Sequence, residues 1–375
     1  MTAAGLIFSN IHDGELLALT EGRTMASVPF GCRYPLIDFA LSNMVNAGIT
    51  NIGMIARSNY RSLLEHIGMG SDWDLARRSG GIKIIAPNVS GTDIENDRSG
   101  ARLGALCGAL GFIRSAKEEF FVLSDPDVIA NIDLADMIRY HVEQGADVTI
   151  ALKRLDAERE RLSRRVKVVR TDTEGNILGI SPYAKQTGEV TVSTNVVVIK
   201  KELLYSLVKE GERRGSLDFY RDLIEGGFGR LKVVAYDYTG YYSLISDLVG
   251  YFECNMKLLD RRARRALFGV EARPIYTKVK NSPPTKYEKG ARVENSLVAD
   301  GCIIKGKVEN SIIFRGVRIG EGSEVKNCIL LPDTTVGERV SLNCVVTDKY
   351  VEIKDERVLS GHPSMCFFVN KGASV

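Results

Sequence analysis

A repeat in the last quarter of the chain restricts the fold more than any other feature of the sequence. Its unit is Asn, then Ser or Cys, then two aliphatic residues, and successive units are fifteen to seventeen residues apart. The units begin at Asn295, Asn310, Asn327 and Asn343. Repeats of this kind stack as coils of a parallel β-helix, because each coil buries its apolar corner on the next. We therefore predict a β-helix over residues 289–375, in which Cys328 and Cys344 share a phase and stack on neighbouring coils.

The first 260 residues alternate short apolar runs with segments of helical periodicity. The apolar runs predict strands at Ala3–Phe8, Asn51–Ala56, Ile82–Ala86 and Phe120–Ser124. The periodic segments predict helices from Leu36 to Gly48, at Tyr60–Ile67 and at Leu103–Ala116. Such βαβ alternation is typical of a mostly parallel, doubly wound sheet. Residues 261–288, a helix and a proline-containing linker, are predicted to connect this α/β domain (1–260) to the β-helix.

A loop of about twenty-five residues separates the first predicted strand from the first predicted helix. Connections in compact domains are usually about four to six residues long, so a loop of this size suggests a function. Open α/β sheets bind their ligands in the crevice at the carboxyl ends of the strands. We therefore place the candidate ligand site in residues 9–35.

Three segments of the chain resemble one family. They are Leu17–Asn43 (LALTEGRTMASVPFGCRYPLIDFALSN), Gly70–Gly81 (GSDWDLARRSGG) and Glu294–Gly322. The family is glucose-1-phosphate adenylyltransferase, also called ADP-glucose pyrophosphorylase. The resemblance implies a Rossmann-like (GT-A-like) nucleotidyltransferase domain with a mostly parallel sheet, followed by a left-handed parallel β-helix. In that family the reaction joins ATP and glucose 1-phosphate into ADP-glucose and pyrophosphate, with Mg²⁺.

The chain departs from this family at five positions where chemistry is expected. Asp13 replaces a glycine, Glu15 a nucleotide-binding arginine, Met25 a lysine, Gly104 an aspartate and Leu244 a metal-binding aspartate. A triphosphate is bound by close backbone N–H groups and by cations. Glu15 reverses the charge that faces the phosphates, and like charges a few ångströms apart repel by about 1 to 4 kcal/mol. The departures therefore predict a scaffold that is kept while turnover is lost.

One metal-binding position of the family is retained, since its aspartate matches Asp127. Asp125 and Asp127 follow a predicted strand, and they fit a vestigial metal site and a polar turn equally well. Asp247 is three residues from Leu244, about 10 Å along an extended chain, and so is a poor replacement for the lost ligand. We therefore expect that this chain requires no cofactor and that a catalytic partner binds the Mg²⁺.

Two arginine-rich runs, at 159–165 and 261–265, are by default solvated helix faces. We prefer this interpretation for the first run. For the second run two interpretations remain open: a solvated helix face, and a subunit contact or an anion-effector surface. The second is considered because the family is regulated by sugar phosphates and related anions. The candidate residues for an effector site or an interface are Arg33, Arg264 and Arg265.

The composition argues against other classes of protein. The chain has 375 residues and a net charge of +3, which is too small to indicate nucleic-acid binding. Its apolar runs are shorter than the roughly eighteen residues of a membrane span, and no secretion signal is recognisable at its N-terminus. The seven cysteines lack C-x-x-C spacing and are typical of reduced thiols. We therefore expect a cytoplasmic protein that binds neither nucleic acid nor membrane.

These features predict a regulatory, catalytically degenerate subunit that acts with a catalytic homologue, as a heterotetramer. Two alternatives remain. The chain could be an active glucose-1-phosphate adenylyltransferase with an unusual loop, or a stand-alone sugar-nucleotide sensor. Acyl transfer, which other β-helix proteins perform, is disfavoured because it needs a histidine base between coils, and His362 lies outside the repeat.

Overall fold

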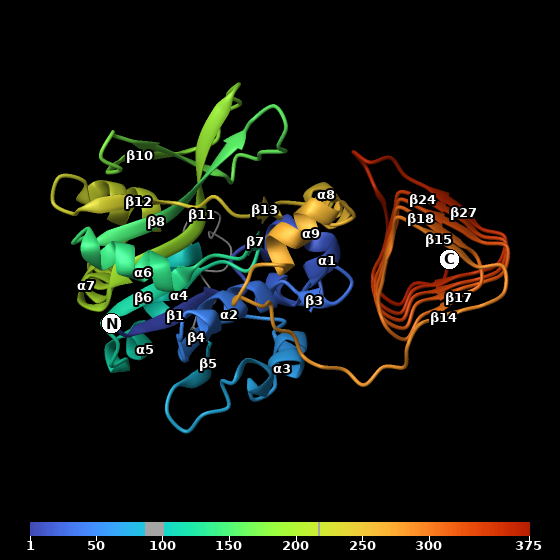
Figure 1. Ribbon diagram of the computed structural model, residues 1–375. Coiled ribbons are helices and arrows are strands. Elements are labelled where there is room, and N and C mark those ends of the chain that lie inside the picture. The colour runs from blue at the N-terminus through green and yellow to red at the C-terminus, as the bar shows by residue number, and fades with distance from the viewer. Residues whose placement is uncertain (87–100, 217) are drawn as a thin grey trace.

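The computed structural model describes residues 1–86, 101–216 and 218–375. Figure 1 shows an α/β part and, beside it, a prism of stacked coils formed by the last quarter of the chain. Among the helices in the described ranges, none is both long and apolar enough to cross a membrane.

A nine-stranded sheet forms the centre of the α/β part, in the order β10-β9-β11-β6-β1-β4-β5, with β8 next to β11 and β12 next to β8. The parallel core consists of β1 (Ala3–Phe8), β4 (Asn51–Ile55), β5 (Gly81–Ile85) and β6 (Phe120–Ser124). The other strands are β8 (Val148–Asp156), β9 (Lys167–Thr171), β10 (Ile177–Pro182), β11 (Glu189–Lys200) and β12 (Val233–Asp237). Strand β11 runs antiparallel to β6 and β8, so the sheet is mixed at this side.

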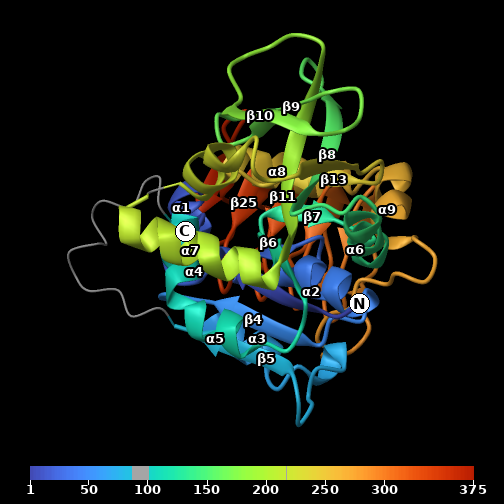
Figure 2. The same cartoon turned by 90° about the vertical axis from the view of Figure 1, so that its left-hand side faces the viewer.

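Helices cover both faces of this sheet, because its central strands are apolar on both sides. Along β1, Leu6 and Phe8 belong to one apolar cluster and Ile7 to the other. Helices α4, α5 and α7 cover the first cluster, while α2, α3 and α6 cover the second (Figure 2). The helices are α2 (Ile37–Asn46), α3 (Arg61–Ile67), α4 (Ala101–Gly108), α5 (Leu110–Ser115), α6 (Leu134–Glu143), α7 (Lys201–Arg214), α8 (Leu248–Lys257) and α9 (Arg261–Phe268).

The predicted strands Ala3–Phe8 and Phe120–Ser124 are confirmed residue for residue. The single predicted helix Leu103–Ala116 is wrong in one respect, because two helices stand there. Buried Ala109 separates α4 from α5, with φ −94° and ψ 0°. The apolar periodicity continues across this break, so the sequence pattern did not reveal it.

The long loop between β1 and α2 contains short helical turns and a small hairpin. Its elements are η1 (Asp13–Glu15), α1 (Leu17–Thr20), η2 (Met25–Ser27), β2 (Pro29–Phe30) and β3 (Tyr34–Pro35). The remaining small elements of the α/β part are η3 (Ser71–Trp73), β7 (Val128–Ala130), η4 (Phe219–Ile224), η5 (Glu225–Gly227) and β13 (Tyr242–Leu244).

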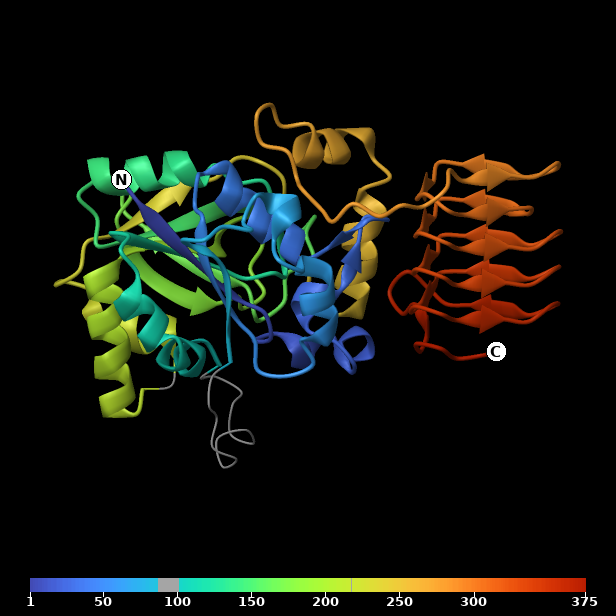
Figure 3. The same ribbon diagram turned by 90° about the horizontal axis from the view of Figure 1, so that it is seen from below.

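The prism is a left-handed β-helix made of three parallel sheets with five short strands each (Figure 3). The first sheet contains β14 (Lys286–Tyr287), β17 (Ile303–Ile304), β20 (Arg318–Ile319), β23 (Thr335–Val336) and β26 (Glu352–Ile353). The second contains β15 (Arg292–Glu294), β18 (Lys307–Glu309), β21 (Glu324–Lys326), β24 (Ser341–Asn343) and β27 (Val358–Ser360). The third contains β16 (Leu297–Val298), β19 (Ile312–Ile313), β22 (Ile329–Leu330), β25 (Val345–Thr347) and β28 (Phe367–Val369).

The predicted coils are confirmed, but the predicted stacking of the two cysteines is wrong. Lys326 pairs with Asn343 across the coils, so Cys344 is level with Asn327 and Cys328 is level with Val345. The corner residue needs a left-handed backbone, which asparagine tolerates well. Asn327 has φ +52° at its corner, and in the next coil Cys344, also with φ +52°, takes that place instead of Asn343.

The loop after β1 and the prism share one apolar cluster. Met25 and Phe30 of the loop are buried in it together with Phe314 and Ile329 of the prism. A buried ion pair crosses the same boundary, since Arg23 Nη2 donates to both carboxylate oxygens of Asp348 at 2.7 Å. The loop that lines the cleft described below is therefore supported from behind by the β-helix.

Candidate functional site

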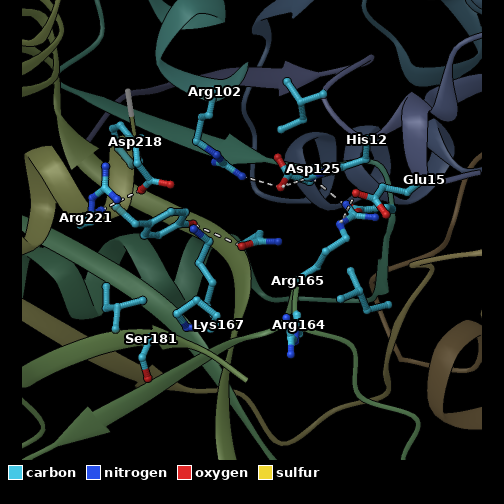
Figure 4. A pocket seen from close by; sticks show the side chains of 18 of the residues that line it. His12, Glu15, Arg102, Asp125, Arg164, Arg165, Lys167, Ser181, Asp218 and Arg221 are labelled. Carbon is cyan, nitrogen blue, oxygen red and sulfur yellow. Dashed lines mark hydrogen bonds and ion pairs between the residues drawn. The ribbon is translucent and has the colours of Figure 1, made fainter. Parts of the chain in front are cut away.

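A cleft of about 440 Å³ opens where β1 and β6 end. These strands are parallel neighbours, so the segments that follow them leave the sheet at the same edge, where open α/β sheets bind ligands. The loop after β1 contributes His12 and Glu15, and the segment after β6 contributes Asp125 (Figure 4). Asp127 comes from the same segment after β6. The location therefore agrees with the site predicted from the loop.

Asp125 and Asp127 form the floor of the cleft, and both side chains are buried. Behind them β7 pairs with β13, with Leu244 opposite Val128. This pairing brings Leu244 into the cleft wall, beside the carboxylates. The structure thus puts an apolar side chain where the family resemblance implies a second metal-binding carboxylate.

Three basic side chains surround these carboxylates. Arg102 on α4 donates Nη2–H to Asp125 Oδ2, and Arg165 Nη2 donates to Asp127 Oδ2 at 3.0 Å. His12 Nε2 lies 3.3 Å from Asp125 Oδ2 and 3.6 Å from Asp127 Oδ2. The floor of the cleft is therefore a compact cluster of alternating charges contributed by four separate segments.

The two carboxyl groups differ in how their charge is balanced. Burial favours the neutral form of both, which raises the pKa of a carboxyl group. At Asp127 burial prevails over the nearby charges of His12 and Arg165, and the pKa is raised. At Asp125 the charge of Arg102, with help from His12, outweighs burial, so the pKa is lowered. Asp125 therefore depends on its basic neighbours to remain ionised inside the protein, whereas at Asp127 these neighbours offset burial only in part.

The family resemblance implies Mg²⁺ at this place, and the residues present do not fit it. His12, Asp125 and Asp127 each offer one ligand atom, all within 4.8 Å of one another. Mg²⁺ prefers an octahedron of oxygen atoms, whereas Leu244 supplies none. One oxygen of each carboxylate is already bonded to a guanidinium group, whose positive charge would repel a metal ion.

The loop after β1 contains a carboxylate, Asp13, that is hydrogen-bonded within the loop. The Asp13 carboxylate accepts a hydrogen bond from the backbone N–H of Met25 at 2.6 Å and another from Asn10 Nδ2 at 2.5 Å. Burial raises the pKa of Asp13 to about 6. Glu15 stands at the cleft wall, with Oε1 4.0 Å from Arg165 Nε. Two carboxylates therefore occupy the loop that, in the family, approaches phosphates.

The other altered positions lie away from the floor of the cleft. Met25 is buried in the apolar cluster shared with the prism. Gly104 is exposed on α4, where an added Cβ would lie 3.2 Å from Arg57 Nη2. The sequence comparison places both at the site, but in this fold neither is part of the cleft wall that the structure describes.

The candidate effector residues also lie outside the cleft. Arg264 Nη1 donates to the backbone carbonyls of Leu258 and Leu259, at 2.6 and 2.8 Å. It thus provides hydrogen-bond donors for carbonyl groups at the carboxyl end of α8, which have no partner within the helix. Arg33 and Arg265 are exposed. The predicted helix face at 159–165 is wrong, because these residues form an irregular connection between β8 and β9.

A second group of basic residues lines the wall opposite the loop. Lys167 Nζ lies 4.1 Å from the centre of the Tyr220 ring, and burial lowers the pKa of this lysine. Arg221 lines the same wall, whereas Arg164 lies beside Arg165 (Figure 4). Sequence reasoning did not single out Arg102 or Lys167, which come from segments with no motif of their own. It included His12 only as part of the loop 9–35, and Arg165 only as part of an arginine-rich run.

Comparisons with known proteins agree with this architecture. Residues 14–181 match the family described as nucleotidyl transferase, and residues 283–363 match the family described as GlmU-like, C-terminal hexapeptide. The fold and the matches together define a nucleotidyltransferase-type protein with a hexapeptide β-helix.

The curated relatives narrow this class. The chain is 31% identical over 369 residues to "Glycogen biosynthesis protein GlgD" of Bacillus subtilis, covering 98% of this chain and 95% of the relative. It is 28% identical over 352 residues to a glucose-1-phosphate adenylyltransferase of Bacillus cytotoxicus (92% and 91% covered). It is 29% identical over 334 residues to one of Clostridium perfringens (88% and 84% covered). The chain therefore belongs to the family of GlgD and glucose-1-phosphate adenylyltransferases.

Proposed function

We propose that this chain is a regulatory subunit of glucose-1-phosphate adenylyltransferase with little or no activity of its own. It would support ADP-glucose synthesis for glycogen through a catalytic homologue. The observation that carries this proposal is the floor of the cleft, where Arg102, Arg165 and His12 surround the two carboxylates and Leu244 replaces a ligand. Two relatives, one named a glycogen biosynthesis protein and the other a glucose-1-phosphate adenylyltransferase, support it.

Catalysis of adenylyl transfer depends on cations that stabilise the charge developing on phosphate oxygens. In this cleft the cations nearest the floor are already paired with carboxylates, and Glu15 adds a negative charge at the wall. The proposed subunit therefore needs no metal, and Mg²⁺ belongs to the catalytic partner. We place the assembly in the cytoplasm, as a hetero-oligomer with four subunits.

The partner's rate would change because this subunit binds the partner's conformations with different affinity. An anionic effector such as a sugar phosphate is part of the proposal. Arg33 and Arg265 are its candidates, since both are exposed, whereas Arg264 is hydrogen-bonded to α8. Equal binding of fructose 1,6-bisphosphate by the wild-type chain and by Arg33→Ala with Arg265→Ala would discard this effector surface.

The decisive experiment is expression of this chain alone, of a catalytic homologue alone and of both together. Each preparation is assayed with ATP, glucose 1-phosphate and Mg²⁺ and is separated by size-exclusion chromatography. We expect at least a hundredfold lower turnover for the chain alone, and one shared peak with altered rate for the pair. Turnover of the lone chain within tenfold of the homologue would favour the active-enzyme alternative. Two peaks that never merge would favour the stand-alone sensor.

A further inference from the structure

The arginine-rich segment at 157–166 connects β8 to β9, and three of its ion pairs tie it to α8 and to the floor of the cleft. Glu160 Oε2 lies 2.6 Å from Lys257 Nζ, and Arg161 forms two hydrogen bonds with Asp247, at 2.9 and 3.0 Å. Asp247 in turn accepts the N–H of Gly250 at 2.7 Å, at the start of α8. The third pair is the contact of Arg165 with Asp127. The segment is thus fixed at both ends, to α8 and to the floor of the cleft.

We propose that this segment makes Arg165 a built-in cation that replaces the divalent metal at Asp127. This inference deepens the proposed loss of turnover, and it rests on that proposal for its functional meaning. It assigns a role to a residue that neither the fold nor the family resemblance explains, and it accounts for how a carboxylate pair can remain buried in this chain.

The charges of the described cleft support a replacement of this kind. Asp127 is fully buried, and a buried carboxylate without a cation is strongly destabilising. Arg102 already serves Asp125, which leaves Arg165 and His12 for Asp127. In a metal-dependent site, the ion would supply the positive charge between two carboxylates. Here Leu244 removes one carboxylate from the wall and Arg165 supplies the charge to the other.

A planar guanidinium group suits this place for a geometric reason. It donates along fixed directions and remains charged at every physiological pH, whereas lysine and histidine can lose their protons when buried. Arg165 reaches two carboxylates, with Nη2 3.0 Å from Asp127 Oδ2 and Nε 4.0 Å from Glu15 Oε1. One side chain therefore links the floor of the cleft to its mouth and opposes the entry of another cation.

The test uses the purified full-length chain and Mn²⁺ as a probe, with binding followed by electron paramagnetic resonance and stability by thermal unfolding. The wild-type chain should show no saturable Mn²⁺ site, and its unfolding temperature should not respond to Mn²⁺ or Mg²⁺. Arg165→Ala should unfold at a lower temperature, because Asp127 loses its cation. Mn²⁺ should bind this variant at least tenfold more tightly than the wild type and should restore part of the lost stability.

Two controls separate this role from general charge effects. Arg164→Ala removes the neighbouring arginine of the same cleft wall, which is exposed, and should behave like the wild type. The double variant Arg165→Ala with Asp127→Asn removes both partners, and Mn²⁺ should no longer bind or stabilise it. If Arg165→Ala does not fold, Arg161→Ala loosens the segment through its anchor at Asp247 and should open a weaker Mn²⁺ site.

Saturable Mn²⁺ binding by the wild-type chain would overturn the inference, as would the absence of Mn²⁺ binding in both the Arg165 and the Arg161 variants. The proposed function fails on different evidence. A wild-type chain that binds Mn²⁺ yet lacks turnover would refute only the built-in cation. A wild-type chain that turns over substrate by itself would refute the regulatory role, whatever its affinity for Mn²⁺.

Discussion

Burial is a main cause of the shifted pKa values of single residues in this protein. Inside the cleft, burial raises the pKa of Asp127, whereas at Asp125 the charge of Arg102 outweighs burial and lowers the pKa. Outside it, two other groups are shifted mainly by desolvation. Burial lowers the pKa of His141 to about 4 and raises the pKa of Asp13 to about 6. These two groups give the stability of the protein opposite dependences on pH.

His141 should make the protein less stable in mild acid. Its Nδ1 lies 2.7 Å from Thr149 Oγ1 and its ring packs edge-on against Phe120, so the neutral form is favoured. The unfolded chain takes up this proton near pH 6.5 and the folded chain only near pH 4. Stability is therefore lost as the pH falls through this window, by about 2 kcal/mol between pH 7.5 and pH 5. Urea titrations at several pH values measure it.

In His141→Gln this part of the pH dependence should vanish, even if the variant is less stable throughout. Asp13 has the opposite sign, because its folded-state pKa is raised and the folded chain gains a proton first. Asp13→Asn should therefore make the acid loss steeper. An unchanged slope in His141→Gln would show that His141 has the same pKa in the folded and the unfolded chain, which would contradict the prediction.

At the scale of elements, the β-helix depends on close contact between the corners of successive coils. Gly306 and Gly320 lie at such corners, where an added Cβ would meet backbone oxygen atoms of the next coil. The left-handed residues Asn295, Asn310 and Asn327 repeat at another corner of the prism, between the second and the third sheet. The stacking is therefore limited by backbone contact as much as by the apolar side chains inside.

Gly320→Ala should destabilise the prism, because its Cβ would lie 2.2 Å from the carbonyl oxygen of Gly337. We expect a loss of about 1 to 3 kcal/mol in the free energy of unfolding, the usual range for overpacking. Gly111→Ala is the matched control, since Gly111 is exposed on α5 with no atom within 4 Å of the added Cβ. That change should be neutral or should stabilise by up to about 1 kcal/mol. Equal effects of the two substitutions would refute the corner contact.

The elements also show how far the sequence predicts this protein. Apolar runs bounded by polar residues locate β1 and β6, and the asparagine repeat locates the coils, because both signals are local. The register of the last repeat unit is ambiguous, since Asn343 and Cys344 both resemble a corner. The cleft is harder to predict. The contacts of Asp125 with Arg102 and of Asp127 with Arg165 join segments that are 23 and 38 residues apart, and no periodicity links them.

At the scale of the whole molecule, the α/β part and the prism behave as one packed body. Apolar residues of the loop after β1, of α8 and of the prism form a common cluster. The ion pair of Arg23 with Asp348 lies in the same boundary, and both side chains are buried. The cleft loop and the β-helix should therefore unfold together.

Breaking this ion pair should be costly. Arg23→Ala leaves Asp348 buried without its partner, and we expect a loss of about 3 to 5 kcal/mol in the free energy of unfolding. Arg23→Met combined with Asp348→Leu replaces both charges with apolar groups and should recover most of that loss. Thermal and urea unfolding of Arg23→Met, of Asp348→Leu and of the double variant give the coupling energy. Additive single effects, with no recovery in the double variant, would contradict the pairing.

Leu244 pairs with Val128, next to Asp127, and this position determines what metal binding in the cleft would require. To bind a metal ion here, the chain would need a carboxylate at position 244 and would have to lose the guanidinium group of Arg165 from Asp127. The first change alone crowds a third acidic group into a buried pocket, and the second alone strands Asp127. We expect each single change to be less stable than the present chain, so the two changes would have to be made together.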